Sequence, residues 1–277
     1  MFTSKLEPAF WTETGIWPRR IICLTSETTE IAFALGAGER VVGVSGYSVR
    51  PAEARQKEKV GAFTSVRMEK IRDLQPDLIL GFSDLQKDIL RDLVGEGFNV
   101  FVTNQRSLSE IGDAILAIGR LLGAEAKAET LRNEFFSTLE MLAGSTPPGP
   151  DKPRVYFEEW DDPMISGISW VSELIELLGG EDVFKEKSSG KTAKERIVSS
   201  EEVIRANPDI IVASWCGKKV QKEKISSRPG WDSLEAVRKN HIHEIKSPDI
   251  LAPGLSLLEG ARQMAAILKI DACDQRR

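Results

Sequence analysis

The feature that most constrains the fold is a segment that occurs twice. Met68–Leu80 (MEKIRDLQPDLIL) aligns with Ser200–Val212 (SEEVIRANPDIIV), with Glu in second position and Pro-Asp before an apolar run. Such a segment is typical of a helix that leads through a turn into a buried strand. Common local chemistry could produce one such match. A second pair, Thr29–Gly36 and Ser172–Gly179, precedes the first in both halves of the chain, so the two matches occur in the same order. We therefore interpret the chain as two related α/β lobes.

A helix-forming stretch separates the two copies. Ala124–Ala143 contains no Gly or Pro, and its apolar residues recur at spacings of three and four, as on one face of an α-helix. At 1.5 Å per residue the helix would run roughly 30 Å. A segment rich in Gly and Pro follows it, which predicts that the helix ends there. The expected parts are an N-terminal arm (1–19), an N-terminal lobe (20–122), a connecting helix (123–144) and a C-terminal lobe (145–277).

Within each lobe, short apolar runs alternate with helix-forming segments. This alternation predicts an α/β fold with mostly parallel sheets covered by helices on both faces. Ligands of such sheets bind outside the carboxyl ends of the strands, so we expect a ligand cleft between the lobes. The expected strands are 20–24, 41–44, 77–80, 99–102, 154–158, 209–214 and 243–245. The expected helices are 30–35, 68–74, 85–94, 109–122, 171–178, 200–206, 231–238 and 255–268, and a loop is expected at 61–65.

Composition excludes some classes of function. The net charge of −5 argues against a nucleic-acid partner, because no basic stripe is present to neutralise phosphates. No run of apolar residues is long enough for a transmembrane helix. Three distant cysteines, Cys23, Cys216 and Cys273, argue against a disulfide framework. The first residues do not form a secretory signal, so we expect a cytoplasmic protein, or a periplasmic one whose signal was removed. We expect a monomer.

The loops that follow the expected strands are rich in aromatic and basic residues. Rigid aromatic rings give flat contact area, and arginines bind carboxylates, phosphates or amide oxygens. Together they favour a large, flat ligand with polar edges, such as a tetrapyrrole or an iron chelate. Alternatively, some of the rings fill the lobe cores. The predicted apolar walls are Tyr47, Phe63, Trp160, Trp170 and Trp215, and the predicted polar contacts are Arg50, Arg106 and Arg228.

Glu69 and Glu201 form a second candidate site. Each opens a helix, where a carboxylate is favoured by the helix dipole and can act as a cap. Because the repeat puts the two residues at equivalent positions in the two lobes, they could also be recognised together by a partner with two basic sockets.

Catalytic and metal-binding motifs are weak. The two histidines, His241 and His243, lie in one tripeptide, which leaves few candidates for a general base. We therefore expect no enzyme activity, no cofactor and no metal site. Cys216 is interpreted first as a buried small side chain, with a cleft-wall position or a metal ligand as alternatives.

The runs Arg20–Val44, Met68–Gly81 and Gly254–Leu268 resemble the helical-backbone periplasmic binding proteins. These are the cobalamin-, haem- and siderophore-binding components of ABC importers. The resemblance covers about residues 20–270 and implies two Rossmann-like lobes, one rigid connecting helix and one ligand, with a corrinoid first and haem or a ferric siderophore next.

The resemblance also carries residue roles. It matches Tyr47 to a tyrosine that lies against the corrin ring, and Glu69 and Glu201 to two glutamates that contact the permease. The segments Glu158–Ile168 and Ala213–Lys219 resemble a cobalamin-binding-like branch whose members are not all exported. Two alternatives therefore remain: a cytoplasmic corrinoid or tetrapyrrole carrier or sensor, and a chelatase-like enzyme that would use His241, His243 or Cys216.

Overall fold

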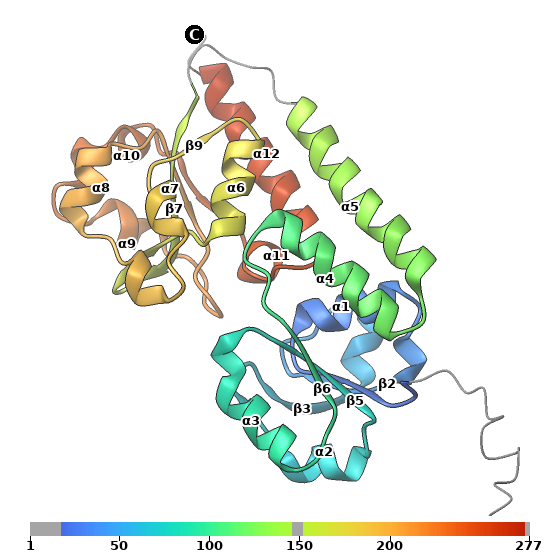
Figure 1. The fold of residues 1–277 in the computed structure, drawn as a ribbon. Coiled ribbons are helices and arrows are strands. Elements are labelled where there is room, and N and C mark those ends of the chain that lie inside the picture. Colours follow the sequence, from blue (N-terminus) through green and yellow to red (C-terminus); the bar gives the residue numbers. More distant parts are fainter. Residues whose placement is uncertain (1–17, 146–151, 275–277) are drawn as a thin grey trace, which may run out of the picture. The chain divides into compact units, whose positions relative to one another are not determined.

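The computed structural model describes residues 18–145 and 152–274, which form two compact units (Figure 1). Of the described residues, the N-terminal unit comprises those up to Asn104 together with Ile115–Glu129, and the C-terminal unit comprises Gln105–Ala114 and those from Thr130 onward. Most of the expected N-terminal arm, the segment after the connecting helix and the side chain of Cys273 lie outside the described residues. In the part of the chain that is described, no helix has the length and apolar character needed to cross a membrane.

The N-terminal unit is built on a six-stranded sheet with the order β4-β3-β2-β1-β5-β6. All neighbouring strands are parallel except the β3–β4 pair. Apolar side chains of the central strands pack against α2 and α3 in a buried cluster that includes Ile22, Ile71 and Leu93. The strands are β1 (Ile21–Cys23), β2 (Val41–Ser45), β3 (Glu58–Ala62), β4 (Ser65–Val66), β5 (Leu78–Phe82) and β6 (Val100–Thr103), and the helices are α1 (Ser26–Ala34), α2 (Met68–Leu74) and α3 (Lys87–Gly95).

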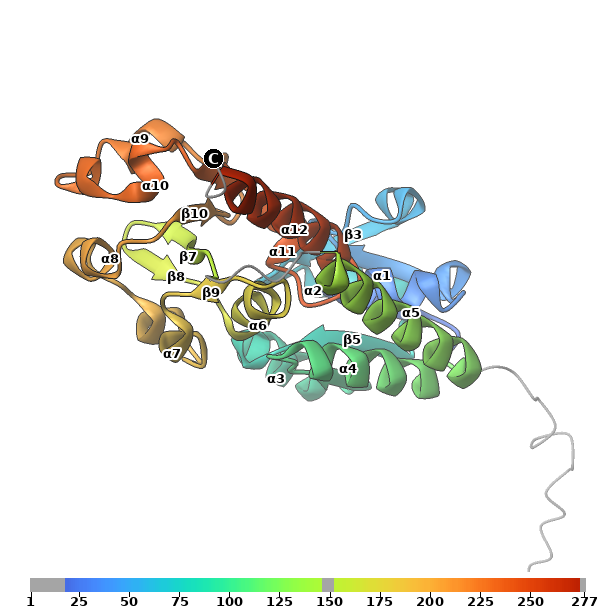
Figure 2. The same cartoon turned by 90° about the horizontal axis from the view of Figure 1, so that it is seen from above.

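The C-terminal unit contains a five-stranded sheet with the order β11-β10-β7-β8, and β9 pairs with β7. Helices α6 and α12 lie on one face of this sheet and α8 and α10 on the other (Figure 2). The strands are β7 (Arg154–Asp161), β8 (Met164–Ser166), β9 (Glu181–Asp182), β10 (Ile210–Ala213) and β11 (Ile242–Glu244). The helices are α6 (Ser169–Leu177), α7 (Lys185–Ser188), α8 (Ser200–Ala206), α9 (Lys222–Ser226), α10 (Glu235–Arg238), α11 (Ser247–Ile250) and α12 (Leu257–Asp274).

Two long helices continue from one unit into the other. Helix α4 (Leu108–Leu121) is followed by α5 (Glu125–Gly144), which confirms the helix predicted over Ala124–Ala143. The period of its apolar residues also predicts the buried side, because Ala128, Phe135 and Leu139 are at most 1% exposed.

The sequence repeat is also a structural repeat. Helices α2 and α8 have the predicted bounds, and each ends at a residue in the left-handed region, Gln75 (φ 46°) and Asn207 (φ 40°). This conformation satisfies the last helical carbonyls and turns the chain toward the next strand.

The Pro-Asp pairs explain how the turn is held in each unit. The Asp77 carboxylate accepts a hydrogen bond from the backbone N–H of Arg20 at 2.9 Å, and that of Asp209 accepts one from Arg154 at 2.8 Å. The Arg20 guanidinium donates to the carbonyl of Leu74, the last residue of α2, at 2.8 Å, and the Arg154 guanidinium donates to the carbonyl of Ala206, the last residue of α8, at 3.1 Å. Each aspartate therefore fixes the start of the central strand beside it.

The structure corrects several predicted elements. The helix predicted at 85–94 is a 3₁₀ turn, η4 (Asp84–Gln86), followed by α3, and the helix predicted at 231–238 is interrupted at Leu234, which is extended. The loop predicted at 61–65 is the β3–β4 hairpin, where a side chain at Gly61 would lie 2.1 Å from the Ser65 carbonyl oxygen. These short elements carry too few apolar residues to produce a periodic pattern.

Candidate functional site

Exposed apolar side chains follow three strands of the N-terminal sheet, β3, β2 and β5, of which β3 and β2 are neighbours and β5 is separated from β2 by β1. Tyr47 and Val49, after β2, are 64% and 39% exposed, and Leu85, after β5, is 55% exposed. Phe63, after β3, is partly exposed. Exposed large apolar residues that gather in one place indicate a binding surface. Tyr47 and Phe63 were predicted from the sequence, whereas Val49 and Leu85 were missed because an isolated aliphatic residue in a loop carries no pattern.

A buried glutamine and a strained serine hold this edge of the sheet. The Gln86 side chain donates to the Phe63 carbonyl at 2.7 Å and accepts from the Phe82 N–H at 3.0 Å. Ser83 has φ 63° and ψ 163°, a region almost restricted to glycine. Its hydroxyl accepts from the Leu85 N–H at 3.2 Å. The turn that carries Leu85 is therefore fixed, at a cost in backbone strain.

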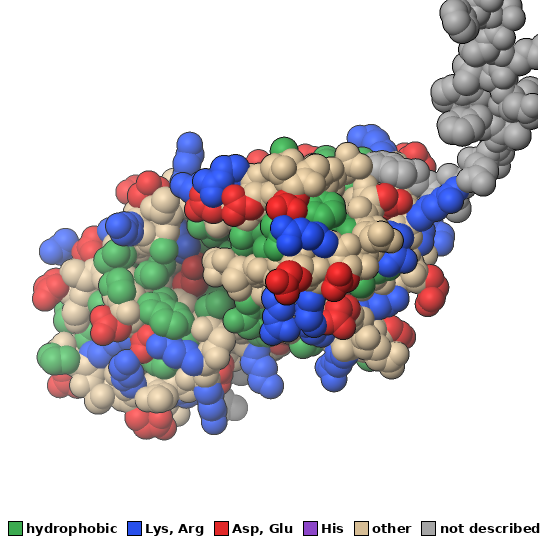
Figure 3. Space-filling view, turned by 90° about the horizontal axis from the view of Figure 1, so that it is seen from below, with side chains coloured by type: hydrophobic (Ala, Val, Ile, Leu, Met, Phe, Trp, Pro, Cys, Tyr) green, Lys and Arg blue, Asp and Glu red, His purple; other side chains and the backbone are tan. Residues whose placement is uncertain are grey.

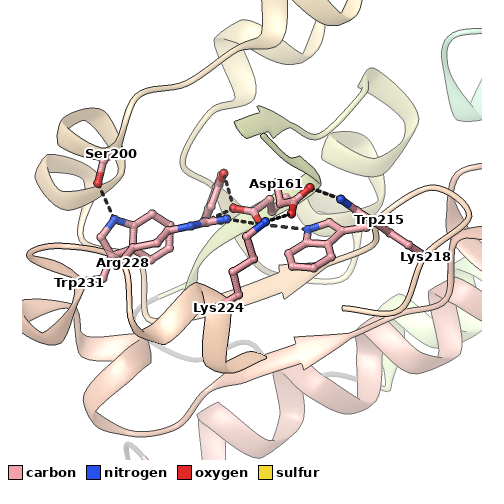
Figure 4. A network of polar contacts seen from close by, with 9 residues as sticks. Asp161, Ser200, Trp215, Lys218, Lys224, Arg228 and Trp231 are labelled. Atoms are coloured by element: carbon pink, nitrogen blue, oxygen red, sulfur yellow. Dashed lines mark hydrogen bonds and ion pairs between the residues drawn. The ribbon is translucent and has the colours of Figure 1, made fainter. Parts of the chain in front are cut away.

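In the C-terminal unit, a fully buried carboxylate lies in β7 at the residue where the pairing of this strand with β10 ends. Glu158 is 0% exposed and accepts hydrogen bonds from three side chains, and these contacts form part of the network in Figure 4. Arg228 binds both carboxylate oxygens, with Nη2 3.0 Å from Oε1. The Trp215 indole N–H and the Tyr156 hydroxyl each donate at 3.0 Å. The charge of Glu158 is thus compensated inside the unit.

This pairing sets the electrostatics of Arg228. Burial alone would lower the pKa of Arg228, but the hydrogen bonds and charge of Glu158 outweigh it and the pKa is raised. The guanidinium also lies 4.6 Å from the Trp231 ring, whose N–H donates to the Ser200 hydroxyl at 2.7 Å. Such a bidentate, stacked pair has little freedom to move.

A second carboxylate, three residues farther along β7, pairs with two lysines. The Asp161 side chain is 2% exposed and contacts the ammonium groups of Lys218 and Lys224, the latter at 2.5 Å. Burial raises the pKa of Asp161, but the two lysines outweigh this effect and lower it to about 2. The Lys218 ammonium lies 3.9 Å from the centroid of the Trp160 ring, within the range of a cation–π interaction.

The face of the molecule in Figure 3 has the same mixed character. In its left part, which belongs to the C-terminal unit, hydrophobic side chains gather in patches bordered by basic and acidic ones. A surface of this kind suits a ligand with an apolar body and polar edges.

Comparison with known proteins assigns the chain to a family. Residues 21–248 match the family described as "Periplasmic binding protein". The chain belongs to this family. The vitamin B12-binding protein of Vibrio vulnificus strain YJ016 is 30% identical over 232 residues, which cover 82% of each chain. An uncharacterized ABC transporter substrate-binding lipoprotein of Bacillus subtilis, YvrC, is 28% identical over 257 residues, 90% of this chain and 79% of the relative.

Solved structures agree with this assignment. The periplasmic vitamin B12-binding protein BtuF of Vibrio cholerae is 26% identical, with a TM-score of 0.73 over 92% of this chain and 98% of BtuF. The heme-binding protein RhuT of Roseiflexus sp. RS-1 has a TM-score of 0.78 over 92% of this chain and 99% of RhuT, but at 22% identity it supports the fold alone. The family and the α/β fold with two lobes, both predicted from the sequence, are confirmed.

The predicted ligand contacts of this periplasmic binding protein lie in different surroundings. Trp160 is partly exposed, whereas Trp170 and Trp215 are 3% and 2% exposed. The Trp170 N–H donates to the Ile250 carbonyl at 3.0 Å. Arg106 is partly buried and belongs to the C-terminal unit. The Trp215 indole N–H donates to Glu158 and so belongs to that network, whereas Trp170 is a buried residue of α6.

The two repeated glutamates are both exposed, in the first turns of α2 and α8. The pKa of Glu201 is lowered by its own backbone N–H and by Ser199. The capping box of α8 uses the next residue, because the Glu202 carboxylate accepts from the Ser199 N–H at 2.7 Å. A capping role thus does not account for Glu201 in full, and the role of Glu69 and Glu201 in docking stays a prediction.

The weak catalytic candidates do not form a cluster in the described part of the chain. No group of three metal-ligating side chains is present among residues 18–145 and 152–274. Burial and the charges of Lys222 and His241 lower the pKa of His243 to about 4. Cys216 is exposed, so its interpretation as a buried side chain is wrong. The residue follows Trp215 in a loop, where the chain has left the apolar strand.

Sequence reasoning missed Glu158, Asp161, Lys218 and Lys224 as parts of the site. The only signal was the presence of acidic residues in an otherwise apolar strand, since Glu158 directly follows the run Val155–Phe157. Their partners could not be recognised, because Arg228 lies 70 residues from Glu158 along the chain.

Proposed function

We propose that this periplasmic binding protein is the solute-binding component of an ABC importer and that it binds a large metal chelate. A corrinoid is the first choice, and haem or a ferric siderophore comes next. The observation that carries the proposal is the match of most of the chain to a family in which a relative 30% identical is a vitamin B12-binding protein. A possible iron-binding solute-binding protein of Staphylococcus epidermidis, 27% identical with a TM-score of 0.78, supports the wider ligand class.

The geometry of each unit supports the same ligand class. The N-terminal unit offers Tyr47, Phe63 and Leu85 as apolar contacts, with Arg50 on the loop after β2. The C-terminal unit offers Trp160 as the accessible ring. Trp170 and Trp215 are almost fully buried and are proposed to pack beneath the ligand-binding surface. Arg106 and Arg228 are proposed to supply polar contacts, with Arg228 held in place by Glu158.

In this proposal, Glu69 and Glu201 each bind a pocket of basic residues on the permease. Their exposure and their equivalent positions at the starts of α2 and α8 support this role. Carboxylates at exposed helix starts can pair with arginines of a partner without rearrangement of the lobe.

The protein is proposed to bind its solute without converting it. Equilibrium dialysis against cyanocobalamin, hemin and a ferric hydroxamate, followed by chromatography of the released ligand, tests both statements. The proposal predicts retention of one ligand, which is released unchanged. Retention of none, or release of a converted product, would contradict it.

A further inference from the structure

Two lysines of the C-terminal unit share one carboxylate, which leaves a surplus of positive charge. Lys218 and Lys224 both pair with Asp161, whose side chain is 2% exposed, whereas the lysine side chains are 40% and 50% exposed. One negative charge offsets only one of the two positive charges. Both ammonium groups therefore remain accessible to a second anion from solvent.

Two indole rings pre-position these ammonium groups. The Lys218 Nζ atom lies 3.9 Å from the Trp160 ring centroid and 5.0 Å from that of Trp215, and the Lys224 Nζ atom lies 5.8 Å from that of Trp215. The Trp160 N–H donates to the Asp162 carbonyl at 2.9 Å, and that of Trp215 donates to the buried Glu158 network. Because the rings are fixed, binding an anion would cost less side-chain entropy than at two free lysines.

We propose that Lys218 and Lys224 form a subsite for an anionic group of the solute, either a carboxylate or a phosphate. Each ammonium would donate a charge-assisted hydrogen bond to the anion, while Asp161 keeps the two groups together. A neutral solute would leave the surplus charge unpaired, so the subsite would select anionic members of the ligand class. The inference rests on the proposed function only in attributing the anion to the solute.

Inorganic phosphate and succinate test the subsite without the solute. Each is titrated into the protein at constant ionic strength, with chloride as the reference, while tryptophan emission is recorded. We expect a saturable change in the wild type, because an anion on Lys218 alters the charge over the Trp160 ring. The double variant Lys218→Met/Lys224→Met is expected to lose the response, and Lys218→Arg/Lys224→Arg to keep it.

Lys219→Met/Lys222→Met is the matched control. It removes two positive charges from exposed neighbours in the same segment, and we expect it to keep the response. Thermal unfolding of each variant verifies that it is folded. A response to phosphate alone or to succinate alone supports the subsite and identifies the anion, and a response to both supports a subsite that accepts either anion. The absence of any saturable response in the wild type, or an equal loss in the control, would overturn it.

A second comparison separates this inference from the proposed function. Hemin and its dimethyl ester differ in their carboxylates, and loss of one charge-assisted contact corresponds to roughly a 10-fold loss of affinity. We expect Lys218→Met/Lys224→Met to weaken hemin by about that factor and to leave the ester unchanged. Equal affinity of wild type and variant for hemin would refute the subsite alone. An anion response without retention of any chelate would refute the proposed function alone.

Discussion

Replacement of Asp161 by Asn should destabilise the C-terminal unit in a way that depends on pH. In the folded protein the pKa of Asp161 falls from an ordinary value of 3.8 to about 2. A difference of this size corresponds to about 2.4 kcal/mol at neutral pH. Because the two lysine side chains are 40% and 50% exposed, water screens part of the interaction. We therefore expect Asp161→Asn to lower the free energy of unfolding by about 1–2 kcal/mol at pH 7.

The sign of the pH dependence follows from the lowered pKa. The carboxylate contributes stability above its unfolded pKa, near pH 4, and loses it as the pH falls toward the folded value near pH 2. At pH 3 this carboxylate is largely protonated in the unfolded chain but still mostly ionised in the folded one. Roughly half of its contribution to the free energy of unfolding should therefore remain. The difference between wild type and variant should shrink accordingly.

Urea unfolding followed by tryptophan fluorescence measures this effect. Four of the six tryptophans, Trp160, Trp170, Trp215 and Trp231, belong to the C-terminal unit. Asp162→Asn is the control, since that exposed neighbour loses the same charge. No difference between wild type and Asp161→Asn at pH 7, or a difference that is as large at pH 3, would refute the reasoning.

Three other changes test other parts of the structure. Arg228→Met leaves the Glu158 carboxylate buried without its counter-ion and should lower the free energy of unfolding, measured in urea titrations, by about 3–5 kcal/mol. Addition of Glu158→Gln should restore part of the lost stability, and full stability of the single variant would contradict the buried pair. Glu69→Ala with Glu201→Ala should leave solute affinity unchanged but abolish uptake by cells that express an exported form, and normal uptake would exclude the docking role. Because the pKa of His243 is lowered to about 4, the folded state resists protonation of this residue, and the stability should fall as the pH drops from about 6.5 to 4. His243→Gln should remove this part of the pH profile of stability, and an unchanged profile would show that another group causes it.

Much of the fold could be predicted because its signals are local. The period of the apolar residues in Ala124–Ala143 and the repeated Pro-Asp turns each lie within about twenty residues of sequence. The helices Met68–Leu74 and Ser200–Ala206 have the predicted bounds. Strands β3, β4, β8 and β9 were missed, because runs of two to five residues are too short to show the alternation that identifies a strand.

The candidate site was less predictable because it depends on contacts between distant residues. The aromatic residues and arginines could be identified, but their surroundings could not. Arg228 was expected to face a ligand, and the structure pairs it with Glu158, 70 residues away. Lys218 covers the Trp160 ring from a loop 57 residues beyond Asp161. The strained backbone at Ser83 also leaves no signal, because the residue type is not the one that such a conformation favours.

A tryptophan-fluorescence titration of the purified protein with cobalamin, hemin and a ferric siderophore tests the central claim most directly. Controls with free tryptophan correct for absorption by the ligands. A protein that binds one large metal chelate should show saturable quenching by one of them at micromolar concentrations, with a stoichiometry of one. The absence of saturable quenching by all three would contradict the claim that this protein is a binding protein for metal chelates.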